Sequence, residues 1–184
     1  NKFVVENHDV INKLSCWYTN ATSLNNKWDE FEATLISNEK KPDVILVTET
    51  WFNESNKREL KDYTNFLNNR TNKTGGGVAI FISTKFSCSV VLNEEFNDIM
   101  VEQIWCELTF NNTKIIVGCI YRPPHCDIQT SIKINNSIKT AAKLVETGKY
   151  NEMMICGDFN HPGLDWNYDG GFNKKNNSTR ASID

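Results

Sequence analysis

Apolar residues recur every three to four positions in two segments of the chain, and this spacing is typical of helices. A helix is predicted over about 25–38, where the apolar stripe comprises Leu24, Trp28, Phe31 and Leu35. A second helix is predicted over roughly 128–147, with Asp127 placed to cap its start and Gly148 placed to end it. The apolar stripe of this second helix comprises Ile128, Ile132, Ile138, Ala142 and Val145.

Apolar runs of strand length fill most of the remaining sequence. The predicted strands are 12–19, 43–49, 78–83, 87–92, 103–110, 114–121 and 152–156. Segments 78–83 and 87–92 are expected to pair as one hairpin, and 103–110 and 114–121 as another around Asn111-Asn112. The polar stretch 51–72 is interpreted as an irregular surface excursion, and the chain from Asn160 onward as loop. Strands that alternate with helices predict one layered α/β domain.

Composition is that of an ordinary globular domain. The 184 residues are 39% hydrophobic and 23% charged, with a formal net charge of −3. This balance argues against a protein that coats nucleic acid with clustered Lys and Arg, but it is compatible with an enzyme that grips a few phosphates through a metal ion. The sequence has no signal-peptide pattern and no long apolar run. Neither secretion nor membrane insertion is therefore expected, and we expect an intracellular location.

Four predicted strands end in a polar side chain that keeps the parity of the apolar residues before it. These polar residues are Asn20, Glu49, Tyr121 and Asp158, the last followed two positions later by Asn160. Period-two alternation places each one on its own strand's face; Ile45 and Val47, for example, lead to Glu49. If the strands lie side by side or in facing sheets, their ends converge on one cleft, where α/β folds tend to bind ligands.

This set of two carboxylates, two carboxamides and a phenol suits phosphate chemistry. Carboxylate and amide oxygens are the ligands that Mg²⁺ or Mn²⁺ prefers. A carboxylate beside the cation can hold or activate an attacking water, while amide and phenol groups orient the phosphate. A single acid at a strand end is usually only the start of a turn. The hypothesis therefore depends on the coincidence across four strands.

The same segments carry short motifs in a fixed order. They are YTNATSL at 18–24, TETW at 48–51, GGGVA at 75–79, YRPP at 121–124, GDFN at 157–160 and DW at 165–166. Together they resemble the endonuclease domain of LINE-type retrotransposons, which lack long terminal repeats, within the endonuclease/exonuclease/phosphatase superfamily. The resemblance spans nearly the whole chain, and Gly-Asp-x-Asn after an apolar strand is its most specific motif.

The resemblance implies a sandwich of two mixed β-sheets with helices outside, and a metal-dependent endonuclease that nicks DNA. It implies that Glu49 is the chief metal ligand and that Asn20 assists, with Mg²⁺ or Mn²⁺ as the cofactor. It also implies that Asp158 positions or deprotonates the attacking water, that Asn160 holds the phosphate and that Tyr121 donates to the phosphate or the leaving oxygen. DNA is the expected substrate, a C-terminal reverse transcriptase domain the expected partner, and the nucleus the expected place of action.

Three residues in or next to these motifs are weaker candidates. Arg122 and His161 are candidates for substrate binding, although a loop histidine next to a proline is more often a solvated turn residue. Trp51 is expected either to line the groove or to pack under a loop.

The family pattern continues with a further metal-site Asp on a late strand and a Ser-Asp-His motif, and residues 1–184 contain neither. The sequence is therefore expected to be a single domain over 1–184, incomplete at its C-terminus and weak or inactive in nicking. Two alternatives stay open: an apurinic-site repair endonuclease, and a non-catalytic relic or binding fragment. Preferential cutting of abasic duplex favours the first alternative. Metal-dependent cleavage that is lost on Glu49→Ala excludes the second.

Overall fold

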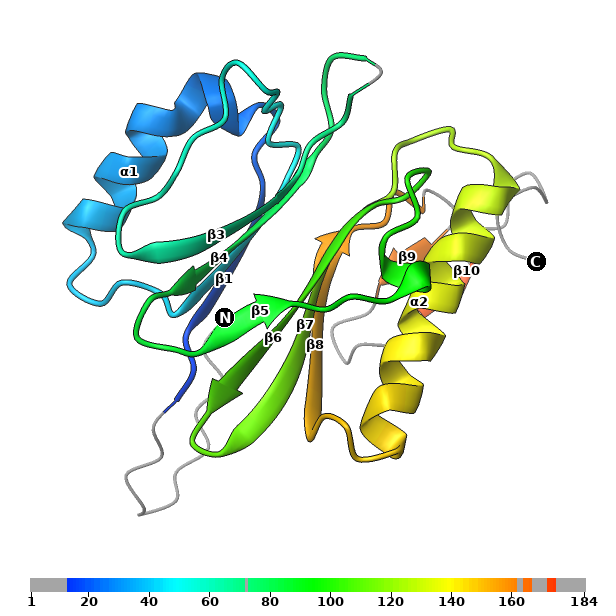
Figure 1. Cartoon of the computed structure of the whole chain (residues 1–184). Helices are drawn as coiled ribbons and strands as arrows, with labels where there is room; N and C mark the ends of the chain where they lie inside the picture. The colour runs from blue at the N-terminus through cyan, green and yellow to red at the C-terminus, as the bar shows by residue number, and fades with distance from the viewer. Residues whose placement is uncertain (1–12, 72, 162–163, 167–171, 175–184) are drawn as a thin grey trace.

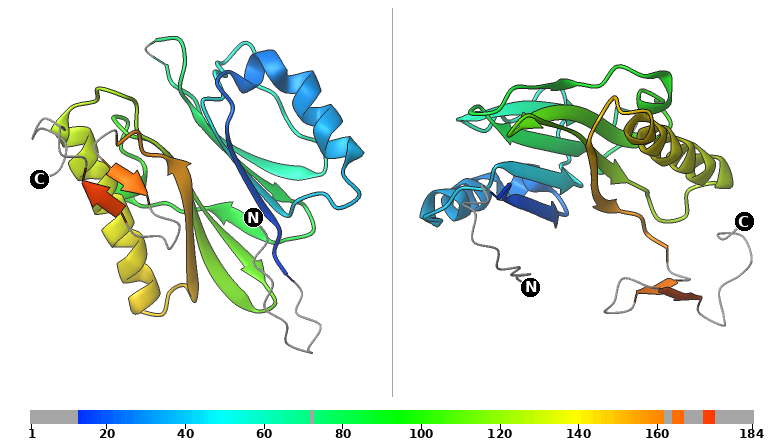
Figure 2. Two further views of the ribbon diagram at one scale, coloured as in Figure 1. Left: turned by 180° about the vertical axis from the view of Figure 1, so that it is seen from behind. Right: turned by 90° about the horizontal axis from the view of Figure 1, so that it is seen from below.

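The structure, a computed structural model, describes residues 13–71, 73–161, 164–166 and 172–174, and consists mainly of two facing β-sheets with a helix outside each (Figures 1 and 2). One sheet has the order β1-β2-β4-β3, with bounds Cys16–Asn20, Val44–Thr48, Val78–Ser83 and Tyr63–Asn68. The other has the order β5-β6-β7-β8, with bounds Cys88–Val90, Glu102–Phe110, Thr113–Tyr121 and Glu152–Asp158. The predicted two-sheet sandwich flanked by helices is confirmed.

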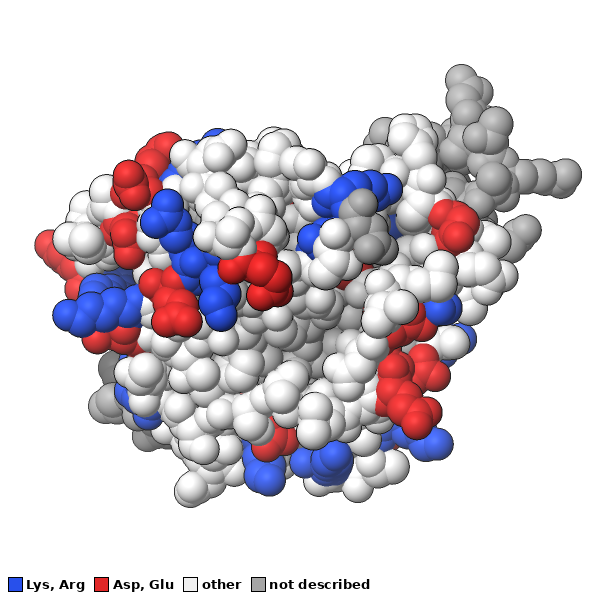
Figure 3. All heavy atoms as spheres, turned by 45° about the horizontal axis from the view of Figure 1, so that its top comes forward, with Lys and Arg blue, Asp and Glu red and all other residues white. Residues whose placement is uncertain are grey.

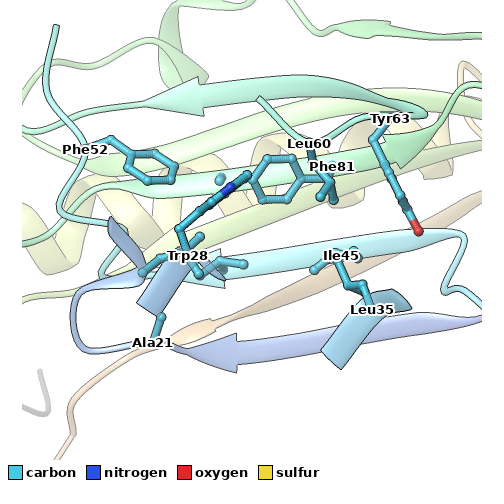
Figure 4. Close-up of a cluster of buried hydrophobic side chains, with 11 residues drawn as sticks. Ala21, Trp28, Leu35, Ile45, Phe52, Leu60, Tyr63 and Phe81 are labelled. Atoms are coloured by element: carbon cyan, nitrogen blue, oxygen red, sulfur yellow. The ribbon is translucent and has the colours of Figure 1, made fainter. Parts of the chain in front are cut away.

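The helix α1 (Trp28–Ser37) covers the outer face of the first sheet and is entered through a 3₁₀ turn, η1 (Leu24–Lys27). Its predicted apolar stripe is confirmed, because Leu24, Trp28 and Leu35 are buried and Phe31 packs against the same cluster. Figure 4 shows Trp28 between Phe52 and Phe81, and the Trp28 and Phe52 rings meet edge to face at 5.8 Å. Burial of each large apolar side chain contributes roughly 1.5–3 kcal/mol, so this cluster holds α1 firmly against β2 and β4.

The helix α2 (Ile128–Glu146) covers the outer face of the second sheet. The predicted cap is confirmed, because the Asp127 carboxylate accepts a hydrogen bond from the Thr130 amide at 2.8 Å. The predicted stripe is wrong in the first half of the helix, where Ile128 and Ile132 are 42% and 41% exposed. The buried residues are Thr130, Ile134, Ser137 and Ala141. In the described part of the chain, no helix is long and apolar enough to cross a bilayer.

A polar residue explains why the buried face of α2 differs from the predicted stripe. The Ser137 hydroxyl is fully buried, donates to the Glu95 carbonyl at 2.7 Å and accepts from the Gln103 side chain at 3.0 Å. A buried hydroxyl is tolerated where such partners satisfy it. Hydropathy spacing alone could not place Ser137 on the inner face.

Some strand predictions are wrong. The stretch 51–72 contains β3, an edge strand that pairs with β4 and is rich in Asn, a residue uncommon in strands. The segment 87–92 does not form a hairpin with 78–83, because β5 pairs with β6 in the opposite sheet. Two short strands, β9 (Leu164–Trp166) and β10 (Phe172–Lys174), pair within the segment interpreted as loop.

The hairpin of β6 and β7 is confirmed. The two strands pair antiparallel from Glu102 opposite Tyr121 to Phe110 opposite Thr113. Asn111 and Asn112 have φ values of 48° and 63°. Positive φ at both positions is typical of the two-residue turn that joins such strands.

Candidate active site

Two parallel strand pairs bring the predicted polar residues to one end of the molecule. In the first sheet β1 pairs parallel with β2, and Asn20 lies opposite Thr48 at the C-terminal ends. In the second sheet β7 pairs parallel with β8, and Tyr121 lies opposite Asp158. Each pair is joined through an outer helix, α1 or α2. Since the C-terminal ends of parallel strands lie at one edge of a sheet, the two facing sheets present these residues to each other.

Four of the predicted side chains are in direct contact. The Asn20 Nδ2 donates to Glu49 Oε1 at 3.1 Å and to Asp158 Oδ2 at 2.8 Å. The Tyr121 hydroxyl donates to the same Glu49 oxygen at 3.2 Å. The four strand ends therefore converge on one cluster, in which two carboxylates share a single amide donor.

Glu49 reaches this cluster by a route that differs from the sequence argument. Ile45 and Val47 pack against α1 on the outer face of the sheet, so continued alternation would place Glu49 on that outer face. Instead β2 ends one residue earlier, and Glu49 adopts a left-handed backbone with φ of 58°. The Glu49 carbonyl accepts from the Ser23 amide at 2.9 Å, which helps to hold this conformation. Such a backbone costs about 1–3 kcal/mol and is often found at functional sites.

Trp51 supports the second carboxylate oxygen of Glu49. Its indole Nε1 donates to Glu49 Oε2 at 3.4 Å, and its backbone amide donates to the Gly76 carbonyl at 2.9 Å. The side chain also lines a groove of about 320 Å³ together with Arg70 and Lys73. Of the two placements considered from the sequence, Trp51 therefore takes the groove-lining one and also contacts the cluster.

Arg122 holds the turn that follows Asp158. Its Nη1 donates to the Asn160 carbonyl at 2.9 Å, and the Asn160 Nδ2 donates back to the Arg122 carbonyl at 2.9 Å. The Arg122 Nε donates to the Ser131 hydroxyl at 3.0 Å, and the residue is only 6% exposed. The backbone N–H of Asn160 also donates to Asp158 Oδ1 at 3.1 Å. Arg122 therefore stabilises the turn through these hydrogen bonds. Its contact with substrate stays a prediction.

The surroundings set the protonation of two predicted residues. Burial and the nearby Glu49 carboxylate raise the pKa of Tyr121 to about 12, so its hydroxyl is a hydrogen-bond donor at neutral pH. Burial and the neighbouring Arg122 cation lower the pKa of His161, which favours a neutral imidazole. His161 is half-buried beside Asn160, and its contact with substrate stays a prediction.

The donor set fits a hard divalent cation that keeps much of its water. Among the described residues, no three Asp, Glu, His or Cys side chains gather as a metal cage. Glu49 and Asp158 supply two carboxylates, and Mg²⁺ is commonly bound by one or two carboxylates together with water and substrate phosphate. The Asn20 amide presents its nitrogen to these carboxylates, while its Oδ1 accepts from the Thr22 amide at 3.1 Å. Ligation by Asn20 therefore requires its amide group to turn over.

Sequence reasoning missed an ion pair beside the cluster. The Arg70 Nε donates to Glu102 Oε1 at 2.8 Å, and the Arg70 guanidinium lies 5.9 Å from the centre of the Tyr121 ring. Glu102 stands opposite Tyr121 across β6 and β7. No sequence motif marks this pair. The only available signal is the position of Glu102 in the hairpin register.

The end of the molecule at which β8 finishes is hollowed and carries charges of both signs. Figure 3 shows the end of the molecule toward which β8 runs, with basic and acidic side chains interspersed around a depression. A groove of about 450 Å³ lies between the segments that follow β3 and β7, with a lining that includes Arg70, Lys73, Met100, Pro124 and His125.

Comparison with known proteins identifies the family. Residues 16–182 match the Endonuclease/Exonuclease/phosphatase family. The chain belongs to this family. Its members are nucleases and phosphatases, enzymes that hydrolyse phosphate esters. No curated protein matches the sequence.

Solved structures share the fold at low sequence identity. They include the endonuclease domain of TRAS1, a telomere-specific non-LTR retrotransposon, with a TM-score of 0.53, 13% identity, and 80% of this chain and 61% of that domain covered. A humanized D. rerio TDP2 has a TM-score of 0.52 and 14% identity, with 80% and 66% covered. D. rerio TDP2 complexed with single-strand DNA product has a TM-score of 0.50 and 13% identity, with 82% and 62% covered. The chain thus spans about two thirds or less of each of these structures.

Proposed function

We propose that the chain is the endonuclease domain of a LINE-type retrotransposon and hydrolyses DNA phosphodiester bonds with Mg²⁺ or Mn²⁺. The observation that carries this proposal is the Asn20 amide nitrogen, which bonds Glu49 at 3.1 Å and Asp158 at 2.8 Å. The ordered motifs from YTNATSL to GDFN favour the retrotransposon domain within the family. The DNA product on the D. rerio TDP2 structure of the same fold is consistent with a nucleic-acid substrate.

In this proposal Glu49, Asp158 and Tyr121 have different roles in phosphodiester hydrolysis. Glu49, with Asn20 or Asp158, holds the cation, which when bound polarises a phosphoryl oxygen. Asp158 orients the attacking water and takes its proton. Tyr121, whose raised pKa keeps it protonated, donates a hydrogen bond to the phosphate or the leaving oxygen. Asn160, fixed by Arg122, orients the phosphate.

Nicking of supercoiled plasmid tests this proposal, because one cut anywhere in the circle relaxes it and weak activity therefore registers. The purified chain is incubated at high enzyme-to-plasmid ratio with Mg²⁺ or with chelator, beside Glu49→Gln and Asp158→Asn. We expect weak, Mg²⁺-dependent nicking that falls further, on the order of 100-fold, in each variant, as for loss of a key electrostatic group. Glu30→Gln, an exposed acid on α1, is the matched control and should nick as the wild type does.

Two outcomes favour the alternatives. Nicking no faster than that of Glu49→Gln would contradict the endonuclease proposal and favour a non-catalytic binding fragment. Much faster cutting of a duplex with one abasic site than of the intact duplex would favour an apurinic-site repair enzyme. The resemblance of the motifs adds two further parts to the proposal, a C-terminal reverse transcriptase domain as partner and action in the nucleus.

A further inference from the structure

The candidate site is divided between the two sheets. Asn20 and Glu49 belong to the first sheet, and Tyr121 and Asp158 belong to the second. Their direct hydrogen bonds join the groups that a cation and a phosphate must engage, so these bonds cannot also fix the spacing of the sheets during a reaction. The apolar core between the sheets sets their overall spacing, and a polar contact near the strand ends that does not use these groups can position the site itself.

Glu102 makes such a contact, called here the inter-sheet tie, beside the candidate site. Its Oε1 accepts from the Arg70 guanidinium, with the Nε contact at 2.8 Å, and its Oε2 accepts from the Gly77 amide at 2.6 Å. Arg70 and Gly77 lie in the segment between β3 and β4 of the first sheet, while Glu102 begins β6 of the second. The Arg70 and Glu102 side chains are 15% and 16% exposed, so solvent screens their attraction less than that of a surface pair.

The inter-sheet tie contacts the candidate site on both sides. Toward the second sheet, Glu102 is the cross-strand partner of Tyr121, and the Arg70 guanidinium lies 5.9 Å from the Tyr121 ring centre. Toward the first sheet, the Gly76 carbonyl accepts from the Trp51 amide at 2.9 Å, and the Trp51 indole bonds Glu49. Gly76 has a φ of 72°, which favours glycine, and a Cβ there would overlap the ends of the Glu102 and Arg70 side chains, which would have to shift.

We propose that Arg70 and Glu102 are positioning residues, which set the spacing between Glu49 on the first sheet and Tyr121 on the second. This inference rests on the proposed nuclease function. Removal of either partner weakens the contact between the Gly76 loop and the Tyr121 strand end, and with it the link between the two halves of the site. A shift of about 1 Å in reacting groups can cost on the order of 100-fold in rate.

A direct contact of Arg70 with a DNA phosphate is the competing role, since Arg70 lines both grooves. The two roles predict different kinetics. Loss of a phosphate contact raises KM and reduces the salt dependence of binding. Loss of a positioning contact lowers kcat and leaves KM nearly unchanged.

The kinetic test compares Arg70→Gln, Glu102→Gln and the double variant in plasmid nicking. Each single variant should lower kcat about 10- to 100-fold with KM within about twofold, and the double variant should be no worse than either single one. Arg70→Lys, which keeps the charge facing Glu102, should recover part of kcat. Lys85→Gln is the control, because its ion pair with Asp43 lies at the opposite end of β2. A raised KM with unchanged kcat, or additive losses in the double variant, would overturn the inference.

A second measurement does not need activity. The NMR resonance of the Trp51 indole N–H is assigned with Trp51→Phe. It should shift in Arg70→Gln and in Glu102→Gln but keep its wild-type position in Lys85→Gln. The indole resonance of Trp17, on the opposite edge strand β1, should keep its position in all three variants. An unmoved Trp51 signal in both variants would contradict the positioning role. If the wild type does not nick DNA but the Trp51 signal still shifts in both variants, the proposed function is contradicted and the contact between the sheets remains supported.

Discussion

Arg122 and Asn160 hold each other through two reciprocal hydrogen bonds, each 2.9 Å long, from the guanidinium to one carbonyl and from the amide side chain to the other. Arg122 follows β7 directly and Asn160 follows β8, so this pair fastens the ends of the two strands that carry Tyr121 and Asp158. The backbone amide of Arg122 also donates to the Asp158 carbonyl at 2.8 Å. The turn that presents the Asp158 carboxylate is therefore fixed by a buried cation.

Replacement of Arg122 by Met should destabilise the protein, because it leaves the Asn160 carbonyl without this donor while keeping an apolar stem. A hydrogen bond to a charged group contributes about 1.5–3 kcal/mol, so we expect the free energy of unfolding to fall by roughly 2–3 kcal/mol. Urea denaturation measures the change. Arg58→Met, at an exposed site, is the control and should stay within about 0.5 kcal/mol of the wild type. Equal stability of the two variants would show that Arg122 does not hold the turn.

Replacement of Asn20 by Asp should make thermal stability depend more strongly on divalent cation. The amide donor that lies between Glu49 and Asp158 becomes a third acceptor, and like charges repel. Without cation the midpoint of thermal unfolding should fall below that of the wild type. With Mg²⁺ it should rise by more than the wild-type midpoint does. Asn20→Ala removes the donor without adding charge, and a Mg²⁺-induced rise in Asn20→Asp no larger than in Asn20→Ala would contradict the cation site.

Acid should weaken the end of the molecule opposite the site. Burial raises the pKa of Asp43, but the Lys85 ammonium and the Ser15 amide outweigh burial and lower the pKa below its ordinary value. A carboxyl with a lowered folded-state pKa stabilises the fold above its unfolded-state pKa, and this stability is lost as pH falls through the folded-state value. The free energy of unfolding should therefore drop more between pH 7 and pH 3 in the wild type than in Asp43→Asn. Equal drops in urea titrations would exclude this contribution.

Much of the fold followed from hydrophobic periodicity, because burial enforces it wherever an element has one apolar face. The stripe of α1 is of this kind, whereas the turn at Asn111-Asn112 followed from the preference of paired Asn residues for positive φ. The spacing failed on α2, since Ser137 is buried through its hydrogen bonds and not through apolarity. The pairing of β5 with β6 could not be read from the sequence either, because a tight connection does not say whether the chain returns to the same sheet or crosses to the next.

The candidate site was predicted in its members but not in its geometry. Motif and strand-end position identified Asn20, Tyr121 and Asp158, which alternation also places on the face between the sheets. Glu49 was identified by the same reasoning, yet only its left-handed backbone brings its carboxylate to them. Hydropathy patterns carry no signal for such a residue. Arg70 and Glu102 were missed for a related reason, since their pairing depends on how the two sheets face each other.

Direct binding of Mn²⁺, followed by electron paramagnetic resonance, tests most directly whether Glu49 and Asp158 form one cation site. We expect the wild type to bind one Mn²⁺ per chain. This binding should be abolished in Glu49→Gln, weakened in Asp158→Asn and unchanged in the exposed control Glu30→Gln. Mn²⁺ binding of wild-type strength in both Glu49→Gln and Asp158→Asn would contradict the shared site.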